Sequence, residues 1–363
     1  MFTKRSSVVY LKYNKVFLIC NYCADYGGNF LASFDYLANK LLSRGVIVYF
    51  VFPKESQSKN WEIDLSKYRV IYCNFNYKNI VDVVSRHLNK NDSAVIHLNF
   101  VSSLILTKFK TAINNRTRYV FHQHMAVNFG AKQIIKGIVL RLCAPKDVAY
   151  IGVSPKVYRD VKKEMGGNKS YLVLNAIDTD RLTTSTEKKS NDILIFGTDF
   201  MRKGVDLAIA AIKNTKISRA CNLLVVTHNQ KSARQLIINK FNEIPNFVKI
   251  LPPSQNVEKL YKHAFLFLSP SRLEAFGYAV VEAAYSGDQV IISDVSGQNV
   301  LSKIPGVKMI QSENIQQLRS TIINAYENRK GNRKKANAAA HEYIDSHYSL
   351  EHWTCNILKI YDA

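Results

Sequence analysis

Two glutamates, Glu274 and Glu282, flank a short turn and are the residues of this chain best suited to chemistry. The apolar run before Ser269 predicts a strand, and the small residues from Tyr278 onward predict a helix. Gly277 lets the backbone of the turn approach a ligand closely, and the free N–H groups at a helix start bind anions. The turn therefore suits a nucleotide sugar: the helix start binds the diphosphate, one carboxylate the sugar hydroxyls and the other the ribose diol.

A second candidate site is the loop 197–204, which lies between a predicted strand (193–197) and a predicted helix (205–212). It contains Arg202 and Lys203, which suit a diphosphate because arginine offers a planar fork of donors and lysine a point charge. The alternative is a solvated loop with two ordinary cations.

The pair Gly27-Gly28 follows the first predicted strand. Two glycines allow a backbone to come close to phosphate or sugar, but a plain tight turn has the same composition. The pattern is not G-x-G-x-x-G, so a dinucleotide fingerprint is absent.

His122 and His124 lie at the end of a predicted strand, and alternate residues of a strand point to the same face. We expect one of them to bind sugar or handle a proton, against the alternative of an ordinary core or loop histidine. A metal site would need further ligands, and the neighbouring sequence offers none. The six scattered cysteines, with one lone C-x-x-C at Cys20 and Cys23, predict reduced structural thiols.

The bulk composition predicts a two-domain protein of the cytoplasm. The 363 residues are long for one domain, and 47% hydrophobic content excludes a disordered chain. No apolar run reaches the roughly 20 residues of a membrane span, and the basic N-terminus lacks a convincing cleavage site for a signal peptide.

The net charge of +22 is concentrated in residues 1–190, which carry +16. This asymmetry indicates an anionic partner, either nucleic acid or an anionic membrane. Segment 131–144 predicts a basic amphipathic helix, which favours the membrane; the alternative is a core-packed helix with a solvated basic face. Its cations are Lys132, Lys136 and Arg141, and its apolar residues are Ile134, Ile135, Val139, Leu140 and Leu142.

Apolar strand-like runs alternate with helix-like runs through both halves, so the fold class is α/β with two doubly wound parallel sheets. The periodicity breaks near 174–189, which separates a domain at 1–180 from one at 190–345; a helix follows at 346–363. Because open α/β sheets bind ligands at the carboxyl ends of their strands, we expect a site in a cleft between two facing domains. Strands are expected at 16–20, 46–52, 70–73, 94–100, 119–122, 148–153, 193–197, 223–226, 247–250, 265–268 and 289–293, and helices at 30–42, 205–212, 257–263, 278–285, 315–326 and 349–361.

Together these motifs resemble glycosyltransferase family 4, the retaining enzymes of the GT-B fold, which has two Rossmann-like domains. His122-Gln-His124 resembles the H-x-H of capsule and O-antigen members, Arg202-Lys-Gly204 the phosphate loop, and Glu274 to Glu282 the family signature. The chain departs from the pattern at three places: Ala176 replaces a usual glycine, Thr198 stands where many members carry arginine, and Asn29-Phe30 after the glycine pair is unusual.

The resemblance implies transfer of a sugar from a nucleotide diphosphate sugar to an acceptor, with retention of configuration and without a metal or cofactor. The N-terminal domain would receive the acceptor and the C-terminal domain the donor, with the last helix crossing back to the N-terminal domain. Glu274 and His124 would be catalytic. The donor would be bound by Gly28, Arg202, Lys203, Ala275, Phe276, Gly277 and Glu282, and the acceptor or its sugar would meet Gly27, Asn29 and His122.

The basic first half adds an expectation about location. A lipid-linked acceptor on the inner leaflet of the cytoplasmic membrane would attract this surface, with Lys132, Lys136 and Arg141 facing the lipid. The sequence thus predicts a peripheral enzyme of capsule, O-antigen or exopolysaccharide synthesis. Two alternatives remain: another GT-B enzyme such as a nucleotide-sugar 2-epimerase, and a basic nucleic-acid-binding protein, in which the two-glutamate turn would have no role.

Overall fold

The chain forms two compact units, described separately below. This computed structural model describes residues 12–61, 63–109, 116–126, 130–165, 169–182, 190–254, 256–329 and 334–363. The first unit comprises Met1–Val153, Val157–Val173 and Trp353–Ala363, and the second comprises Ser154–Lys156 and Leu174–His352.

The first unit is built on a seven-stranded parallel sheet with the order β3-β2-β1-β4-β5-β6-β7. Its central strand β1 is buried along its whole length, as expected for a parallel sheet covered on both faces. The strands are β1 (Lys15–Cys20), β2 (Ile47–Pro53), β3 (Arg69–Cys73), β4 (Ala94–Asn99), β5 (Thr117–Gln123), β6 (Val148–Gly152) and β7 (Ser170–Leu172).

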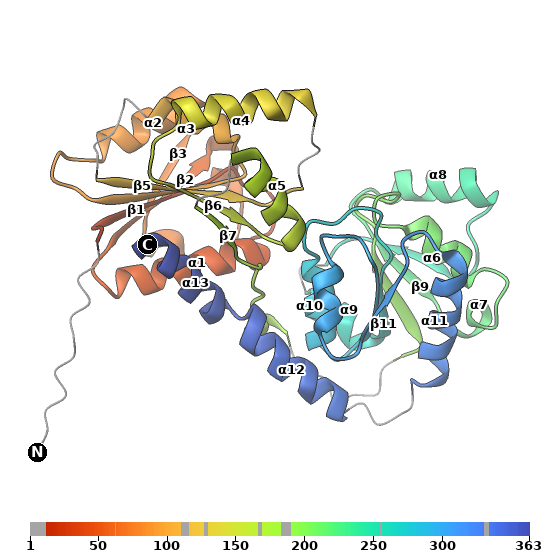
Figure 1. Cartoon of the computed structure of the whole chain (residues 1–363). Helices are drawn as coiled ribbons and strands as arrows, with labels where there is room; N and C mark the ends of the chain where they lie inside the picture. Colours follow the sequence, from red (N-terminus) through yellow and green to blue (C-terminus); the bar gives the residue numbers. More distant parts are fainter. Residues whose placement is uncertain are drawn as a thin grey trace, which may run out of the picture. The chain divides into compact units, whose positions relative to one another are not determined.

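Helices cover both faces of this sheet: α2, α3 and α4 lie on one face, and α1 and α13 on the other (Figure 1). The helix predicted at the C-terminus is confirmed as α13, and its residues from Trp353 onward belong to the first unit. The helices are α1 (Gly28–Leu42), α2 (Tyr77–Arg86), α3 (Leu106–Phe109), α4 (Ala131–Cys143), α5 (Pro155–Met165) and α13 (Leu350–Asp362).

The second unit has a six-stranded parallel sheet with the order β10-β9-β8-β11-β12-β13. Its strands are β8 (Asp192–Phe196), β9 (Leu223–Val226), β10 (Val248–Leu251), β11 (Ala264–Ser269), β12 (Gln289–Ser293) and β13 (Val307–Ile310). Its helices are α6 (Val205–Ile212), α7 (Ile217–Ala220), α8 (Gln230–Phe241), α9 (Val257–His263), α10 (Tyr278–Tyr285), α11 (Ile315–Glu327) and α12 (Lys334–Tyr348).

The predicted fold class is confirmed, because both units are parallel α/β sheets with their first strands near the centre. The sequence did not predict β7 and β13, which are two of the four edge strands. Both are short, and β13 carries the exposed residues Lys308 and Met309, so neither has the continuous apolar run that marks an interior strand. No helix of the described residues has the length and apolar character needed to cross a membrane.

Candidate functional site

Two loops of the second unit meet where the sequence places its charged motifs. Lys203, from the loop after β8, donates to the Glu274 carboxylate with 2.5 Å between Nζ and Oε2. The guanidinium of Arg202 lies 3.9 Å from the same oxygen and donates to the carbonyl of Leu273 at 3.3 Å. The structure thus brings together three of the predicted site residues, although Lys203 and Glu274 are 71 positions apart in sequence.

The two loops approach closely because one of them has a glycine at the contact. Gly204 has a φ of +70°, and a Cβ there would lie 2.1 Å from the carbonyl oxygen of Pro270. Any other residue would push the loops apart and would also be strained at that φ.

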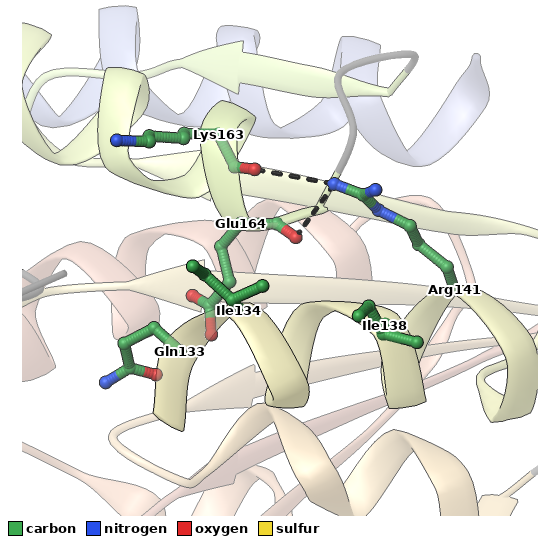
Figure 2. A pocket seen from close by; sticks show the side chains of 6 residues that line it. All are labelled: Gln133, Ile134, Ile138, Arg141, Lys163 and Glu164. Atoms are coloured by element: carbon green, nitrogen blue, oxygen red, sulfur yellow. Dashed lines mark hydrogen bonds between the residues drawn. The ribbon is translucent and has the colours of Figure 1, made fainter. Parts of the chain in front are cut away.

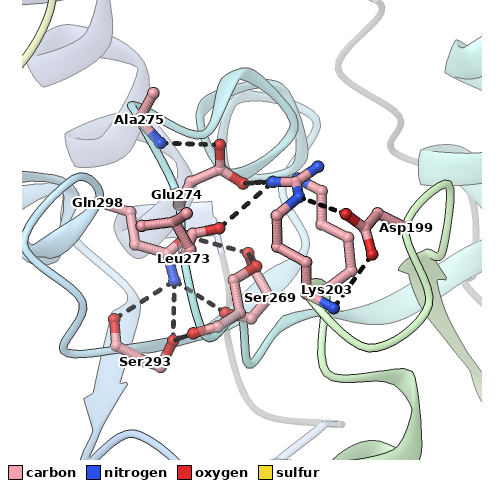
Figure 3. A network of polar contacts seen from close by, with 10 residues as sticks. Asp199, Lys203, Ser269, Leu273, Glu274, Ala275, Ser293 and Gln298 are labelled. Carbon is pink, nitrogen blue, oxygen red and sulfur yellow. Dashed lines mark hydrogen bonds and ion pairs between the residues drawn. The ribbon is translucent and has the colours of Figure 1, made fainter. Parts of the chain in front are cut away.

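Glu274 is held in a fixed orientation between the cations and its own backbone. Its Oε1 accepts from the N–H of Ala275 at 3.1 Å, and its side chain is only 11% exposed (Figure 3). A carboxylate fixed in this way, with Lys203 and Arg202 beside it, can accept hydroxyl hydrogens while the cations neutralise a phosphate.

A buried glutamine, Gln298, connects the end of β11, just before the turn that carries Glu274, to the end of β12. The Nε2 of Gln298 donates to the carbonyl of Ser269 at 2.9 Å and to the Oγ of Ser293 at 3.1 Å, while its Oε1 accepts from Ser269 at 3.0 Å (Figure 3). The neighbouring Gly297 packs directly on the turn, since a Cβ there would lie 1.5 Å from the carbonyl oxygen of Glu274. Sequence reasoning missed both residues, because neither belongs to a local pattern around the motif.

The predicted helix after the turn is confirmed as α10, with Gly277 at its N-cap at φ +103°. This left-handed conformation favours glycine and leaves the first N–H groups of α10 at the turn. The side chain of Phe276 is 2% exposed and packs near Tyr278 and Tyr348, so it belongs to the core. Only the backbone of Phe276 is available for the donor contact that the sequence predicted.

Glu282 lies within α10 and is bound by two residues that the sequence analysis did not single out. The hydroxyl of Tyr261 donates to its Oε2 at 2.7 Å, and Arg181 lies 3.4 Å from its Oε1. Burial and the nearby Glu282 carboxylate raise the pKa of Tyr261, so its hydroxyl stays protonated as the donor. This carboxylate is therefore oriented before any ligand arrives.

The histidine pair of the first unit lies in an aromatic cluster at the end of β5. His124 stacks on His122 with ring centroids 4.2 Å apart, and on Phe100 at 4.3 Å. His122 is 1% exposed, so its ring offers almost no surface for the predicted acceptor contact, whereas His124 is only partly buried. Phe30 of α1 packs edge-on against His124 at 5.5 Å, which places the start of α1 beside this histidine.

The glycine pair of the first unit lies at that helix start. Gly27 is the N-cap of α1, and Gly28 follows with a φ of +57° that favours glycine. Asn29 is 6% exposed, so an acceptor would have little access to its side chain.

Three histidines of this cluster, His97, His122 and His124, remain uncharged at neutral pH. Burial lowers the pKa of His124 to about 3. The pKa values of His97 and His122 also lie well below their usual value, chiefly because burial disfavours the charged ring and secondarily because of charge on His124. These histidines are thus hydrogen-bonding groups rather than cations.

This arrangement predicts that the first unit loses stability in mild acid. Below about pH 6.5 these histidines bind protons in the unfolded state but not in the folded state. Each of them therefore lowers the free energy of unfolding by about 1.4 kcal/mol for every pH unit below that value. Urea unfolding at pH 7.5, 6.5 and 5.5 can be followed by fluorescence of Trp61 and Trp353, which both lie in this unit. We expect a clear fall between pH 6.5 and 5.5 and a shallower fall in His97→Gln; equal stability at all three values would contradict it.

The predicted basic helix is confirmed as α4, and it has an exposed apolar surface. Lys132 is exposed, but Lys136 forms an ion pair with Glu164 at 3.0 Å. Arg141 donates to the carbonyls of Lys163 and Glu164 at 3.5 Å (Figure 2). Two of the three cations thus also tie α4 to α5. The exposed apolar side chains of α4 are Ile134, Ile135, Ile138, Val139 and Leu142, with 37–70% of their surface accessible. Among all the residues of α4, only Gly137 and Leu140 are buried. The alternative of a core-packed helix is therefore wrong.

Metal-binding side chains do not gather anywhere in the described parts of the chain: no three His, Cys, Asp or Glu residues there could share an ion. The described cysteines are all free thiols.

Comparison with known proteins shows that the second unit is similar to a known family. Residues 177–342 match the family model of the glycosyl transferases group 1, and no curated protein sequence matches the chain. This match includes the loop with Arg202 and Lys203, the turn with Glu274 and the helix with Glu282. Residues 177–342 are therefore similar to the catalogued domain of the glycosyl transferases group 1.

Solved structures match the chain over nearly its whole length. A glycosyltransferase from Rickettsia africae matches with a TM-score of 0.77 at 15% identity, over 96% of this chain and 98% of that one. HepE from Anabaena, solved with UDP, matches with a TM-score of 0.73 at 15% identity, over 95% and 98%. WaaG, a glycosyltransferase of lipopolysaccharide biosynthesis, matches with a TM-score of 0.67 at 18% identity, over 95% and 99%. These matches show that the chain has the fold of the GT-B glycosyltransferases.

Proposed function

We propose that this protein is a retaining, metal-independent family 4 enzyme that transfers a hexose from a nucleotide diphosphate sugar to a lipid-linked glycan. The observation that carries the proposal is the Glu274–Lys203–Arg202 cluster at the start of α10. It combines a fixed carboxylate for sugar hydroxyls with two cations and a helix N-terminus for a diphosphate. HepE was solved with UDP, so uridine nucleotides are the first to test.

In this proposal, different residues of the second unit bind different parts of the nucleotide sugar donor. Glu282, already oriented by Tyr261 and Arg181, takes the ribose hydroxyls at one end. Glu274 takes hydroxyls of the transferred sugar at the other end. Lys203, Arg202 and the start of α10 stabilise the negative charge that the diphosphate gains as its bond to the anomeric carbon breaks.

Charge neutralisation by these groups removes the need for a metal in the proposed reaction. The acceptor hydroxyl forms the new bond to the anomeric carbon on the face that the diphosphate leaves, and its proton passes to the leaving diphosphate. Acceptor binding is assigned to the first unit, where His124 is the accessible member of the histidine pair and Gly27 and Gly28 lie at the start of the neighbouring helix.

A direct test of the reaction supplies UDP-, GDP- and dTDP-hexoses with a polyprenyl diphosphate glycan in detergent. The proposal predicts release of one nucleoside diphosphate only when the acceptor is present, with the anomeric configuration of the product retained by NMR. A change of the sugar ring without transfer would instead indicate a 2-epimerase, and inversion would exclude the retaining mechanism.

The exposed apolar face of α4 supports a membrane location for the acceptor. Five large apolar side chains are exposed on one helix of 13 residues, beside the exposed Lys132 and Arg141. Apolar side chains with flanking cations are typical of helices that lie in the surface of an anionic bilayer. We therefore place the enzyme at the inner leaflet of a bacterial cytoplasmic membrane, in synthesis of capsule, O-antigen or exopolysaccharide.

This location predicts that α4 controls binding to lipid vesicles. In Ile135→Ser/Leu142→Ser, the loss of two apolar side chains should weaken binding to phosphatidylglycerol vesicles by about tenfold or more in a flotation assay. The matched control is Leu236→Ser/Ile238→Ser on α8, whose side chains are also exposed and apolar. Equal loss in both variants, or no binding by the unmodified protein, would contradict the proposed contact.

A further inference from the structure

A buried hydrogen-bonded chain joins the C-terminal helix to the histidines of the first unit. The hydroxyl of Tyr361, on α13, lies 2.7 Å from Nδ1 of His97 on β4. Nε2 of His97 lies 3.1 Å from Nδ1 of His122 on β5. The three side chains are almost completely buried, with exposed fractions of 2%, 0% and 1%. Tyr361 and His97 are 264 positions apart in sequence.

Hydrogen-bond counting gives this chain a direction. Nε2 of His122 is buried and has no hydrogen-bond partner among the described residues. If Tyr361 donates to His97 and His97 donates to His122, one N–H on His122 is left unsatisfied. If instead His122 donates to His97 and His97 donates to Tyr361, two groups are left unsatisfied. These are the hydroxyl hydrogen of Tyr361 and the unprotonated Nε2 of His122, and both are buried. The first arrangement costs less, so Tyr361 is the donor that begins the chain.

His122, at the end of this series of hydrogen bonds, lies against His124. The His122 and His124 rings stack 4.2 Å apart at 28°, and Phe100 stacks on His124 at 4.3 Å. Phe100 has a φ of +56°, a conformation that bulky residues avoid, so the fold accepts backbone strain where this ring meets His124.

The ring of His124 is also oriented by an amide. Its Nε2 lies 2.9 Å from Oδ1 of Asn99, whose amide nitrogen lies 3.5 Å from the carbonyl of Ile19. Since Oδ1 can only accept, Nε2 of His124 carries the hydrogen. Nδ1 is then the acceptor nitrogen of an uncharged ring, suited to receive a hydrogen bond from a hydroxyl of the ligand.

We propose that Tyr361 is a positioning residue. Through its hydrogen bond to His97 it determines which ring nitrogens of His97 and His122 are protonated. His122 in turn supports the stacked ring of His124 in the orientation that accepts a hydrogen bond from a sugar or acceptor hydroxyl. The role of His124 in binding a ligand hydroxyl rests on the proposed function. The part that concerns the protonated nitrogens does not, so the two can fail separately.

The first measurement determines the histidine protonation of the unmodified protein. Two-bond ¹H–¹⁵N spectra of the histidine-labelled protein at pH 7.5 distinguish a ring protonated at Nε2 from one protonated at Nδ1. We expect His97, His122 and His124 all to be protonated at Nε2, with assignments from single His→Gln variants. A His122 ring protonated at Nδ1 would overturn the proposal, whatever the activity.

The second measurement compares Tyr361→Phe with Tyr13→Phe. Tyr13 belongs to the same cluster, with its ring 5.7 Å from Tyr361, and its buried hydroxyl has no hydrogen-bond partner among the described residues. Each variant thus removes one buried hydroxyl, but only Tyr361→Phe interrupts the chain.

We expect Tyr361→Phe to change the His97 and His122 signals and to lower kcat/KM for the acceptor by about three- to tenfold, with donor affinity changed less than about twofold. Tyr13→Phe should leave the signals and kcat/KM as in the unmodified protein. Unchanged histidine signals in Tyr361→Phe, or the same losses in both variants, would overturn the proposal. If no sugar transfer is found, the spectra still decide whether Tyr361 sets the histidine state.

Discussion

Glu274→Gln is expected to lower the rate of sugar transfer by about 100-fold or more, with little change in affinity for the nucleoside diphosphate. The substitution keeps the size of the side chain and removes its charge. The amide cannot act as a full acceptor for Lys203 and for sugar hydroxyls at once, and Lys203 then loses the carboxylate 2.5 Å away that fixes it. The nucleotide should still bind, because Glu282 and its partners are unchanged.

The matched control for this prediction is Glu313→Gln. Glu313 is also an ion-paired glutamate of the second unit, 2.7 Å from Arg272, but 60% of its side chain is exposed and it lies outside the turn. Steady-state rates at saturating donor should separate the two variants. Equal rates for Glu274→Gln and the unmodified enzyme would remove Glu274 from the proposed mechanism.

Gly297→Ala is expected to displace the turn that carries Glu274. The added Cβ would lie 1.5 Å from the carbonyl oxygen of Glu274 and 2.4 Å from its carbonyl carbon, and backbone atoms cannot yield as a flexible side chain can. We expect a loss of roughly 3 kcal/mol in unfolding free energy for the second unit, as for other overpacked sites. We also expect nucleotide affinity to fall by about tenfold, because the start of α10 moves with the turn.

Gly130→Ala is the control for this substitution. Gly130 has an extended backbone with φ −154°, and an added Cβ would meet no atom within 4 Å. Thermal unfolding and nucleotide titration of both variants test the prediction. A Gly297→Ala protein with unchanged melting temperature and affinity would mean that the turn does not pack on Gly297.

The sequence was sufficient for the interior strands of both sheets and for the charged half of the proposed donor site. Central strands such as β1 are apolar throughout, and Arg202, Lys203, Glu274 and Gly277 lie in loops that follow such strands. These signals are local, because each depends on residues within one loop and its flanking elements.

The residues that orient the site could not be predicted in this way. Gln298 reaches Ser269 across 29 positions, and Tyr361 reaches His97 across 264. A buried glutamine or tyrosine has no sequence signature, because its partner is decided by how distant elements pack. His122 and Phe276 illustrate the converse: each stands in a motif that the sequence predicted to be functional, but its side chain is buried in the fold.

The central claim is that the second unit binds a nucleotide sugar through Glu282 and the turn at Glu274. Its most direct test is calorimetric titration of UDP, GDP and dTDP into the full chain and into Glu282→Ala, with Glu313→Gln as the control. The account predicts micromolar affinity for one of the three nucleotides, about tenfold or more weaker in Glu282→Ala and unchanged in Glu313→Gln. Absence of binding by all three nucleotides, or equal affinity in Glu282→Ala, would contradict it.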